Sequence, residues 1–511
     1  MPTLDVSELN IVLGVLVKIK CKWYLGEALP AVLIGILLGP LAAKFIDSER
    51  WGSATEGQTS AITLGLARVM IGVQLVIAGY QLPAKYQQLR WKEMALCLLP
   101  IMTIMWLSTT VCMLATVPKI TLLAALVIGS CVTCTDPILS QAIAKGPFAD
   151  KFVARDLREI ISSEAGANDG FGFPFLMLAV YLIRHADIPG AGESNEGTAS
   201  IAERAVRLVL REEHGVGRLG GGVGVALTNW FVETWLYIVL MSVAIGVVVG
   251  FASGKALKFA LRKQWVDSES YLLYPTAIGL WLVGICGMLG TDDLLACFVA
   301  GNAMNWDGDY LAETEKRHDE VNSCVDVLLN FGGFMYIGTI MPWDQFNQPD
   351  VTGLTYPRLF ALGFLVMAFR RIPAIMISYK LMPKVEHTRH LFPELGQGDE
   401  EETNLVRVMI PVVYWLVLFS IVFHGLSIPA LNLIYKFAGV KPIQEDAVEL
   451  RRISMHVPTP NNAMVCDRDT FIAYNRFSRP VFNTAELPYL GKNAGPKMYT
   501  HDDKSFESLG K

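Results

Sequence analysis

The stretch "ISSEAGANDGFGFPFLMLAV", residues 161–180, places three polar side chains at the start of an apolar segment: Glu164, Asn168 and Asp169. About 20 apolar residues are enough to cross the roughly 30 Å hydrocarbon core of a bilayer as a helix. An ionised side chain at the centre of that core costs about 2.5–3.5 kcal/mol on the insertion scale. The stretch therefore predicts a membrane helix whose carboxylates face a partner or a cavity.

The composition extends this prediction to most of the chain. Its 511 residues are 52% hydrophobic and 18% charged, with a mean hydropathy of +0.39, whereas about 25% of the residues in a typical soluble domain are charged. We therefore predict an all-α polytopic membrane protein with about 12 transmembrane helices. The predicted helices span residues 10–25, 28–45, 60–83, 93–116, 120–144, 155–183, 228–252, 270–289, 291–304, 320–341, 355–380 and 404–436.

Basic connectors set the predicted orientation of the transmembrane domain, which covers residues 1–440. Three connectors are rich in Lys and Arg and are expected in the cytoplasm: residues 84–92, 144–158 and 254–263. The amino terminus is then expected outside, and so are three loops: residues 46–59, 185–226 and 342–354. The longest of these is polar and glycine-rich, with one short helix expected at 200–213.

The two ends of the chain give further expectations. The first apolar run, residues 11–17, has no basic region before it, so no cleavable signal peptide is expected. Residues 441–511 form a polar tail dotted with prolines, and we expect this tail to be largely disordered.

A second polar group lies in "GSCVTCTDPILSQAIA", residues 129–144. Pro137 lacks a backbone N–H and interrupts a helix. Freed carbonyls, the Thr135 hydroxyl and the Asp136 carboxylate together suit a small hard cation. The alternative is a kinked helix whose second half is capped by Asp136, and the two interpretations are compatible. The CxxC formed by Cys131 and Cys134 has no second pair and is expected to serve helix packing.

The polar residues of the opening stretch differ in direction. Glu164 and Asn168 are four residues apart and share a helix face, whereas Asp169 points about 140° away from Glu164. The two acids are therefore expected to do different jobs: one is a structural partner, the other an exchangeable site. The alternative is that all three residues cap the start of a helix.

Two further charged pairs need a partner or an explanation. In "LGTDDLLACFVAGN", residues 289–302, Asp292 and Asp293 suit either helix capping or cation attraction, and the sequence leaves both open. Arg370 and Arg371 lie inside a predicted helix, and arginine stays charged at any accessible pH. We prefer Arg371 as the partner of Glu164, with Arg370 as the substitute. The alternative is that both arginines snorkel to the cytoplasmic side.

The chain resembles the fungal plasma-membrane sodium (potassium)/proton antiporters of the sodium–proton exchanger, or monovalent cation:proton antiporter, family. The similarity extends in order over seven segments of the membrane part: residues 22–40, 68–83, 133–153, 162–182, 291–307, 369–373 and 420–429. The resemblance implies an inverted-repeat fold with two crossed, partly unwound helices at the ion site. It also implies a homodimer.

The resemblance also assigns roles. Asp169 resembles the carboxylate that binds the cation, Na⁺, and the proton, and Asn168 resembles its asparagine neighbour. Thr135 and Asp136 resemble residues of the unwound helix.

The remaining residues are implied to be accessory or structural. Glu164 and Arg371 resemble the family's structural ion pair. Asp292 and Asp293 match an accessory acidic pair that fungal members carry.

One segment departs from the family pattern. The family has a glycine-rich broken helix where residues 381–404 of this chain are polar, so one helix is expected to be missing. The chain is then either a shortened form or a variant with a rebuilt site. The last predicted helix, 404–436, is long enough to bend or break at Gly425 or Pro429, and a reversal within it would restore the parity of the crossings.

The implied function is secondary active transport. The resemblance implies exchange of Na⁺, or Li⁺ or K⁺, for H⁺ across the plasma membrane, for alkali-cation export and pH homeostasis. Asp169 would be the shared site. We expect no enzyme activity, no cofactor and, with a net charge of −5, no nucleic-acid partner; the partners are cations, protons, the bilayer and a second copy. One alternative is a non-transporting or truncated relative that acts as a sensor or scaffold. An intramembrane aspartyl protease is disfavoured because the G-x-G-D motif is missing.

Overall fold

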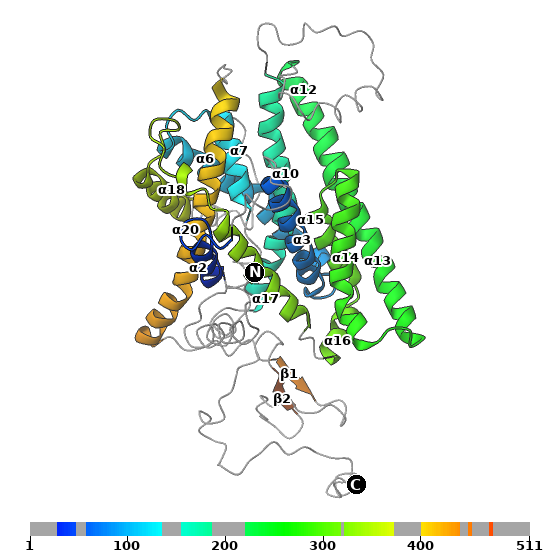
Figure 1. Ribbon diagram of the computed structural model, residues 1–511. Helices are drawn as coiled ribbons and strands as arrows, with labels where there is room; N and C mark the ends of the chain where they lie inside the picture. Colours follow the sequence, from blue (N-terminus) through cyan, green and yellow to red (C-terminus); the bar gives the residue numbers. More distant parts are fainter. Residues whose placement is uncertain are drawn as a thin grey trace, which may run out of the picture. The chain divides into compact units, whose positions relative to one another are not determined.

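The computed structural model describes residues 28–46, 58–134, 155–186, 220–317, 321–371, 400–439, 448–451 and 470–473. In chain order the elements are α2 (Ala28–Leu38), α3 (Gln58–Tyr80), α4 (Tyr86–Leu89), α5 (Trp91–Leu96), η2 (Cys97–Ile101), α6 (Met102–Thr116), α7 (Leu122–Thr133), α10 (Arg155–Arg184), α12 (Gly222–Asn229), η3 (Trp230–Leu240), α13 (Met241–Arg262), α14 (Ser268–Leu289), α15 (Asp293–Met304), α16 (Asp309–Lys316), α17 (Val321–Thr339), η4 (Trp343–Gln345), α18 (Tyr356–Phe369), α20 (Glu400–Ala438), β1 (Val448–Arg451) and β2 (Thr470–Ala473) (Figure 1). The predicted all-α class is confirmed for the membrane part.

Within the described residues, six helical segments are long and apolar enough to cross a membrane: Thr59–Tyr80, Trp91–Thr116, Leu157–Arg184, Gly222–Arg262, Ser268–Leu289 and Arg407–Ala438. Five apolar helices are shorter: Ala28–Leu38, Leu122–Thr133, Asp293–Met304, Cys324–Thr339 and Tyr356–Phe369. Each of these segments overlaps a predicted helix. The helix expected at 10–25 and the short one at 200–213 lie outside the described residues.

One predicted helix is longer than expected at both ends. The helix expected at 228–252 runs from Gly222 to Arg262 through α12, the π-helical η3 and α13. At 1.5 Å per residue this is about 60 Å of helix, twice the thickness of a hydrocarbon core. The basic connector expected at 254–263 is therefore wrong as a loop, because its residues up to Arg262 continue the helix.

The last membrane helix is continuous. The backbone of α20 is helical at both Gly425 and Pro429, so a break or a reversal at these positions is wrong. Part of the polar segment expected to replace the missing helix, residues 381–399, lies outside the described residues.

A short strand pair lies in the tail. β1 pairs antiparallel with β2, in the register Val448↔Ala473. The sequence predicts no regular structure at these positions. The domain boundary at residue 440 stays a prediction.

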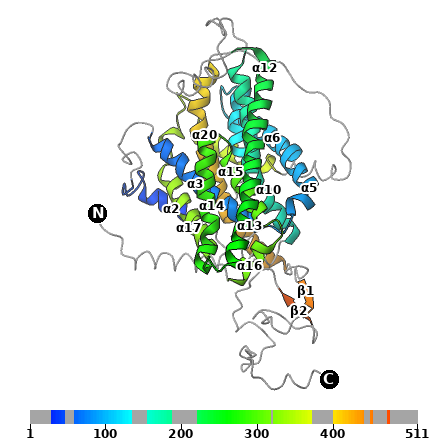
Figure 2. The same ribbon diagram turned by 90° about the vertical axis from the view of Figure 1, so that its right-hand side faces the viewer.

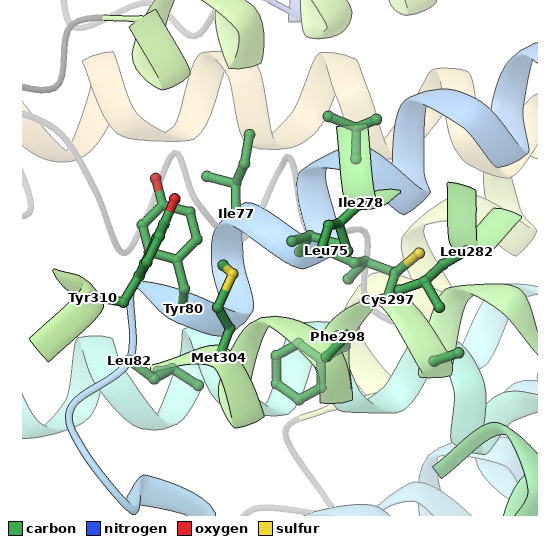
Figure 3. Packing of buried hydrophobic residues seen from close by; sticks show 14 of the residues in the cluster. Leu75, Ile77, Tyr80, Leu82, Ile278, Leu282, Cys297, Phe298, Met304 and Tyr310 are labelled. Atoms are coloured by element: carbon green, nitrogen blue, oxygen red, sulfur yellow. The ribbon is translucent and has the colours of Figure 1, made fainter. Parts of the chain in front are cut away.

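The larger core cluster joins α3, α14, α15 and α16. Its members include Leu75, Leu282 and Phe298, which project into the space between these helices (Figure 3). α15 also packs along α13, and the four helices α3, α13, α14 and α15 lie side by side in both views (Figures 1 and 2). This packing buries the middle of α15 on several sides.

Glycines set how closely two of the helix pairs approach. A Cβ on Gly301 of α15 would overlap the Val76 carbonyl of α3, and a Cβ on Gly338 of α17 would overlap the Val32 carbonyl of α2. Only a residue without a side chain fits at these two positions.

Adding a methyl group to Gly338 should separate α2 from α17. We expect Gly338→Ala to destabilise the protein by about 1–3 kcal/mol because backbone atoms cannot move aside as flexible side chains do. Gly332 of the same helix has open space where its Cβ would lie, so Gly332→Ala should be neutral or stabilising by up to about 1 kcal/mol. Thermal unfolding of the two purified variants in detergent checks this; equal melting temperatures would contradict the close approach.

A second cluster joins α6, α7, α18 and α20. It is built around Phe346, Leu359 and Trp415, which are buried, and the Trp415 indole N–H donates to the Leu359 carbonyl at 2.9 Å. The cluster fixes the amino-terminal half of α18, the helix whose far end carries Arg370 and Arg371.

Candidate functional site

The polar residues of the opening stretch lie in the middle of α10. The helix begins at Arg155, so Glu164 lies more than two turns inside it. The alternative that these residues cap a helix start is therefore wrong. Glu164 and Asn168 are buried, and Asp169 is half-buried.

Three glycines define the two neighbours of this part of α10. A Cβ on Gly166 would overlap the Phe298 ring, and one on Gly170 would lie 2.5 Å from the Leu295 Cβ. Both contacts are with α15. A Cβ on Gly172 would instead overlap the Cys134 sulfur at the end of α7.

These contacts determine the direction of Asp169. At 100° per residue, the Asp169 side chain points about 60° from the Gly166 direction and about 60° from the Gly172 direction. It therefore lies between the amino-terminal half of α15 and the carboxyl-terminal end of α7.

α7 ends abruptly beside Asp169. The helix expected at 120–144 ends at Thr133, and Cys134 is extended, with φ −59° and ψ 141°. Pro137 explains this end, because it has no N–H to donate to the carbonyl four residues earlier, that of Thr133. Thr135 and Asp136 lie outside the described residues, so their place at the site stays a prediction.

Arg370 donates hydrogen bonds to the backbone carbonyls that lose their helical donors at this break. Its Nη2 donates to the Thr133 carbonyl at 3.0 Å and to the Cys134 carbonyl at 2.9 Å. A cation is favourable at a helix carboxyl terminus because the carbonyl dipoles point toward it. The sequence proposed Arg370 only as a substitute partner for Glu164, and this contact was missed.

Arg371 turns the other way. Its Nη2 lies 2.5 Å from Glu164 Oε2, and the two side chains are 35% and 8% exposed. The adjacent arginines thus bind two different helices: Arg370 binds the end of α7, and Arg371 binds α10, the helix that carries Asp169. The alternative that both snorkel to the cytoplasmic side is wrong. That the Glu164–Arg371 pair maintains an exchange site stays a prediction.

The acidic pair divides between two contacts. Asp292 is the N-cap of α15, and its Oδ1 accepts from the Leu295 N–H at 3.0 Å. Asp293 is buried, and its Oδ2 accepts from Arg68 Nε on α3 at 2.7 Å. The capping alternative is therefore realised at Asp292, while cation attraction by the pair stays a prediction.

Sequence reasoning missed Arg68, although a signal for it exists. Arg68 is the single charged residue between positions 58 and 80 of an apolar segment. A lone arginine in such a segment requires a buried partner. Only the fold, however, reveals which carboxylate it meets.

Capping and charge at Asp292 can be separated by two substitutions. Asparagine caps a helix about as well as aspartate. We expect Asp292→Asn to keep the melting temperature, and Asp292→Ala to lose about 1 kcal/mol of stability. Unfolding curves of both variants check this; if Asp292→Asn is as unstable as Asp292→Ala, the carboxylate charge contributes more than the cap.

Within the described part of the chain, no three His, Cys, Asp or Glu side chains group to hold a metal ion. What the described residues place on the two sides of Asp169 are α15, through Leu295 and Phe298, and the broken end of α7.

Comparison with known proteins identifies the family. The profile described as "Sodium/hydrogen exchanger, transmembrane" matches residues 10–393. The chain belongs to the sodium/hydrogen exchanger family.

Curated relatives from fungi agree with this assignment. A probable Na⁺/H⁺ antiporter of Schizosaccharomyces pombe is 33% identical over 444 residues, which cover 80% of this chain and 53% of that protein. Na⁺/H⁺ antiporter 2 of Zygosaccharomyces rouxii is 33% identical over 371 residues, which cover 73% of this chain and 41% of that protein. The Na⁺/H⁺ antiporter of Saccharomyces cerevisiae is 30% identical over 450 residues, which cover 81% of this chain and 41% of that protein. This member of the exchanger family thus spans about half the length of these relatives.

Among solved structures, the sodium proton antiporter MjNhaP1 of Methanocaldococcus jannaschii matches at 14% identity with a TM-score of 0.49, covering 82% of this chain and 97% of that one.

Proposed function

We propose that the protein exchanges Na⁺ for H⁺ across the plasma membrane, with Asp169 as the site that both ions share. The observation that carries the proposal is the position of Asp169, in mid-helix between the broken end of α7 and α15, in a chain of the exchanger family. A carboxylate in that position needs a neutralising partner that can leave again.

Competition at one carboxylate accounts for exchange. Na⁺ and H⁺ both neutralise Asp169, so binding of one displaces the other. If the neutralised site can switch between the two faces of the membrane and the empty anionic site cannot, competition becomes coupled exchange. One exchanging carboxylate gives one-for-one, electroneutral exchange. Li⁺ and K⁺ would compete for the same oxygens.

The ion pairs and hydrogen bonds that neighbouring charged side chains make with one another support the proposal. Glu164 pairs with Arg371, Arg370 binds the end of α7, and Asp293 binds Arg68. In this proposal these contacts maintain the shape of the site while Asp169 changes partners. Homodimerisation is proposed from the family resemblance.

Transport by the purified chain tests the proposal. The protein, with residues 381–404 as they stand, is reconstituted into liposomes that contain a pH-sensitive dye, and Na⁺ is added outside. We expect rapid alkalinisation of the lumen, because Na⁺ enters in exchange for luminal H⁺, acidification when the Na⁺ gradient is reversed, and no response to choline. A well-folded protein without any Na⁺-driven pH change would favour the sensor or scaffold alternative.

A further inference from the structure

Arg68 connects three helices at the amino-terminal end of α15. Its Nε donates to Asp293 Oδ2 at 2.7 Å, and the side chains of Arg68 and Asp293 are 34% and 8% exposed. A Cβ on Gly287, in the last turn of α14, would lie 3.0 Å from Arg68 Nη2. The guanidinium thus lies between the carboxyl terminus of α14 and the amino terminus of α15, where the helix dipoles favour a cation and an anion respectively.

α15 is also attached to α3 further along its length. In the middle, a Cβ on Gly72 would lie 3.5 Å from the Cys297 sulfur. At the far end, the Asn305 side chain donates to the Leu82 carbonyl at 3.0 Å. The rest of α15 is thus attached by close packing against α3 and by a hydrogen bond to Leu82, just beyond the end of α3, whereas its amino-terminal end is attached through the Arg68–Asp293 ion pair.

That amino-terminal end is the part of α15 that faces Asp169. Leu295 contacts α10 at Gly170, the residue next to Asp169. Asp292 lies one residue before Asp293 and caps this end of the helix by accepting from the Leu295 N–H. A shift of the first turn of α15 would therefore change the packing on one side of Asp169.

We propose that Arg68 is a positioning residue of the exchange site: through Asp293 it fixes the first turn of α15 against α10 beside Asp169. Asp293 is then the partner of Arg68 and not a cation ligand. This inference rests on the proposed function, and it assigns the cation site to the Asp169 side of α15.

Transport kinetics test the functional half of the inference. We expect Arg68→Ala to raise the KM for Na⁺ about tenfold, with the maximal rate within about threefold of the wild type. A shift of the first turn of α15 beside Asp169 should weaken Na⁺ binding more than it slows the later steps. Arg68→Lys retains the charge and should recover most of the affinity. The exchanged pair Arg68→Asp with Asp293→Arg should recover part of it, because arginine at the first turn opposes the helix dipole.

Native thiols test the structural half without transport. Cys286 and Cys297 are buried beside the start of α15, whereas Cys324 of α17 is exposed. In detergent, a small maleimide should label Cys286 and Cys297 at least about fivefold faster in Arg68→Ala than in the wild type, because local opening exposes them. Mass spectrometry of the same samples measures the labelling of each cysteine. The labelling rate of Cys324 should be the same in both proteins, and Arg68→Lys should restore the protection of Cys286 and Cys297.

The outcomes separate this inference from the proposed function. An Arg68→Ala protein with wild-type KM and wild-type protection of both thiols overturns the inference, and so does a variant that loses only thermal stability. If the wild-type protein exchanges no Na⁺, the proposed function fails; the labelling experiment then decides whether Arg68 fixes α15, and unchanged protection overturns that as well.

Discussion

Replacing Asp169 with asparagine should reduce Na⁺-driven proton flux in proteoliposomes at least about fiftyfold, to the level of protein-free liposomes. Asparagine has nearly the same shape but carries neither a charge for Na⁺ nor a titratable oxygen for H⁺. The protein should still fold, because the ion pairs of its neighbours, Glu164–Arg371 and Arg68–Asp293, do not involve this side chain.

Two further variants serve as controls for the loss of flux in Asp169→Asn. Asp169→Glu retains the carboxylate on a longer side chain and should leave measurable but slower exchange. Asp344 lies exposed in η4, away from the helix interior, so Asp344→Asn makes the same chemical change without affecting flux. Wild-type flux in Asp169→Asn, measured with the same dye and the same amount of reconstituted protein, would place the exchange site elsewhere.

The Glu164–Arg371 pair should show the largest effect on stability. Arg371 stands next to Arg370 in the chain, so Glu164→Ala leaves two adjacent positive charges with one carboxylate fewer. Removing one member of a buried ion pair costs about 3–5 kcal/mol, and because Arg371 is 35% exposed we expect about 2 kcal/mol here.

A double-mutant cycle measures this coupling. Melting temperatures are compared for the wild type, Glu164→Ala, Arg371→Ala and the protein carrying both changes. The double variant should be clearly more stable than the sum of the single losses predicts, because each single change already breaks the pair. Losses that add would mean that the two side chains stabilise the fold independently, despite their 2.5 Å contact.

The sequence predicts α10 well because the cause is local. The predicted range 155–183 agrees with the observed bounds Arg155–Arg184, and the different directions of Glu164 and Asp169 follow from helix geometry. The end of α7 is also local in origin: Pro137 leaves the Thr133 carbonyl without its helical donor. The predicted range 120–144 placed no helix end at Thr133, although the sequence indicates that Pro137 interrupts the helix.

Other features depend on contacts between distant segments. The directions of Arg370 and Arg371 could be predicted only as a choice, since adjacent helical residues point about 100° apart and the sequence does not show which neighbour each one meets. Arg68 was overlooked because its partner lies 225 positions away. The helical extension to Arg262 was missed because basic residues were interpreted as a loop, whereas a long helix can project beyond the bilayer.

The central claim is that Na⁺ and H⁺ share the Asp169 carboxylate, and proton release on Na⁺ binding tests it most directly. The purified protein in weakly buffered detergent, near the pH at which exchange is half-maximal, is mixed with NaCl while a pH indicator is followed. We predict the release of up to about one proton per chain from the wild type, since Na⁺ displaces the proton, and none from Asp169→Asn. Equal proton release by both proteins would contradict the account.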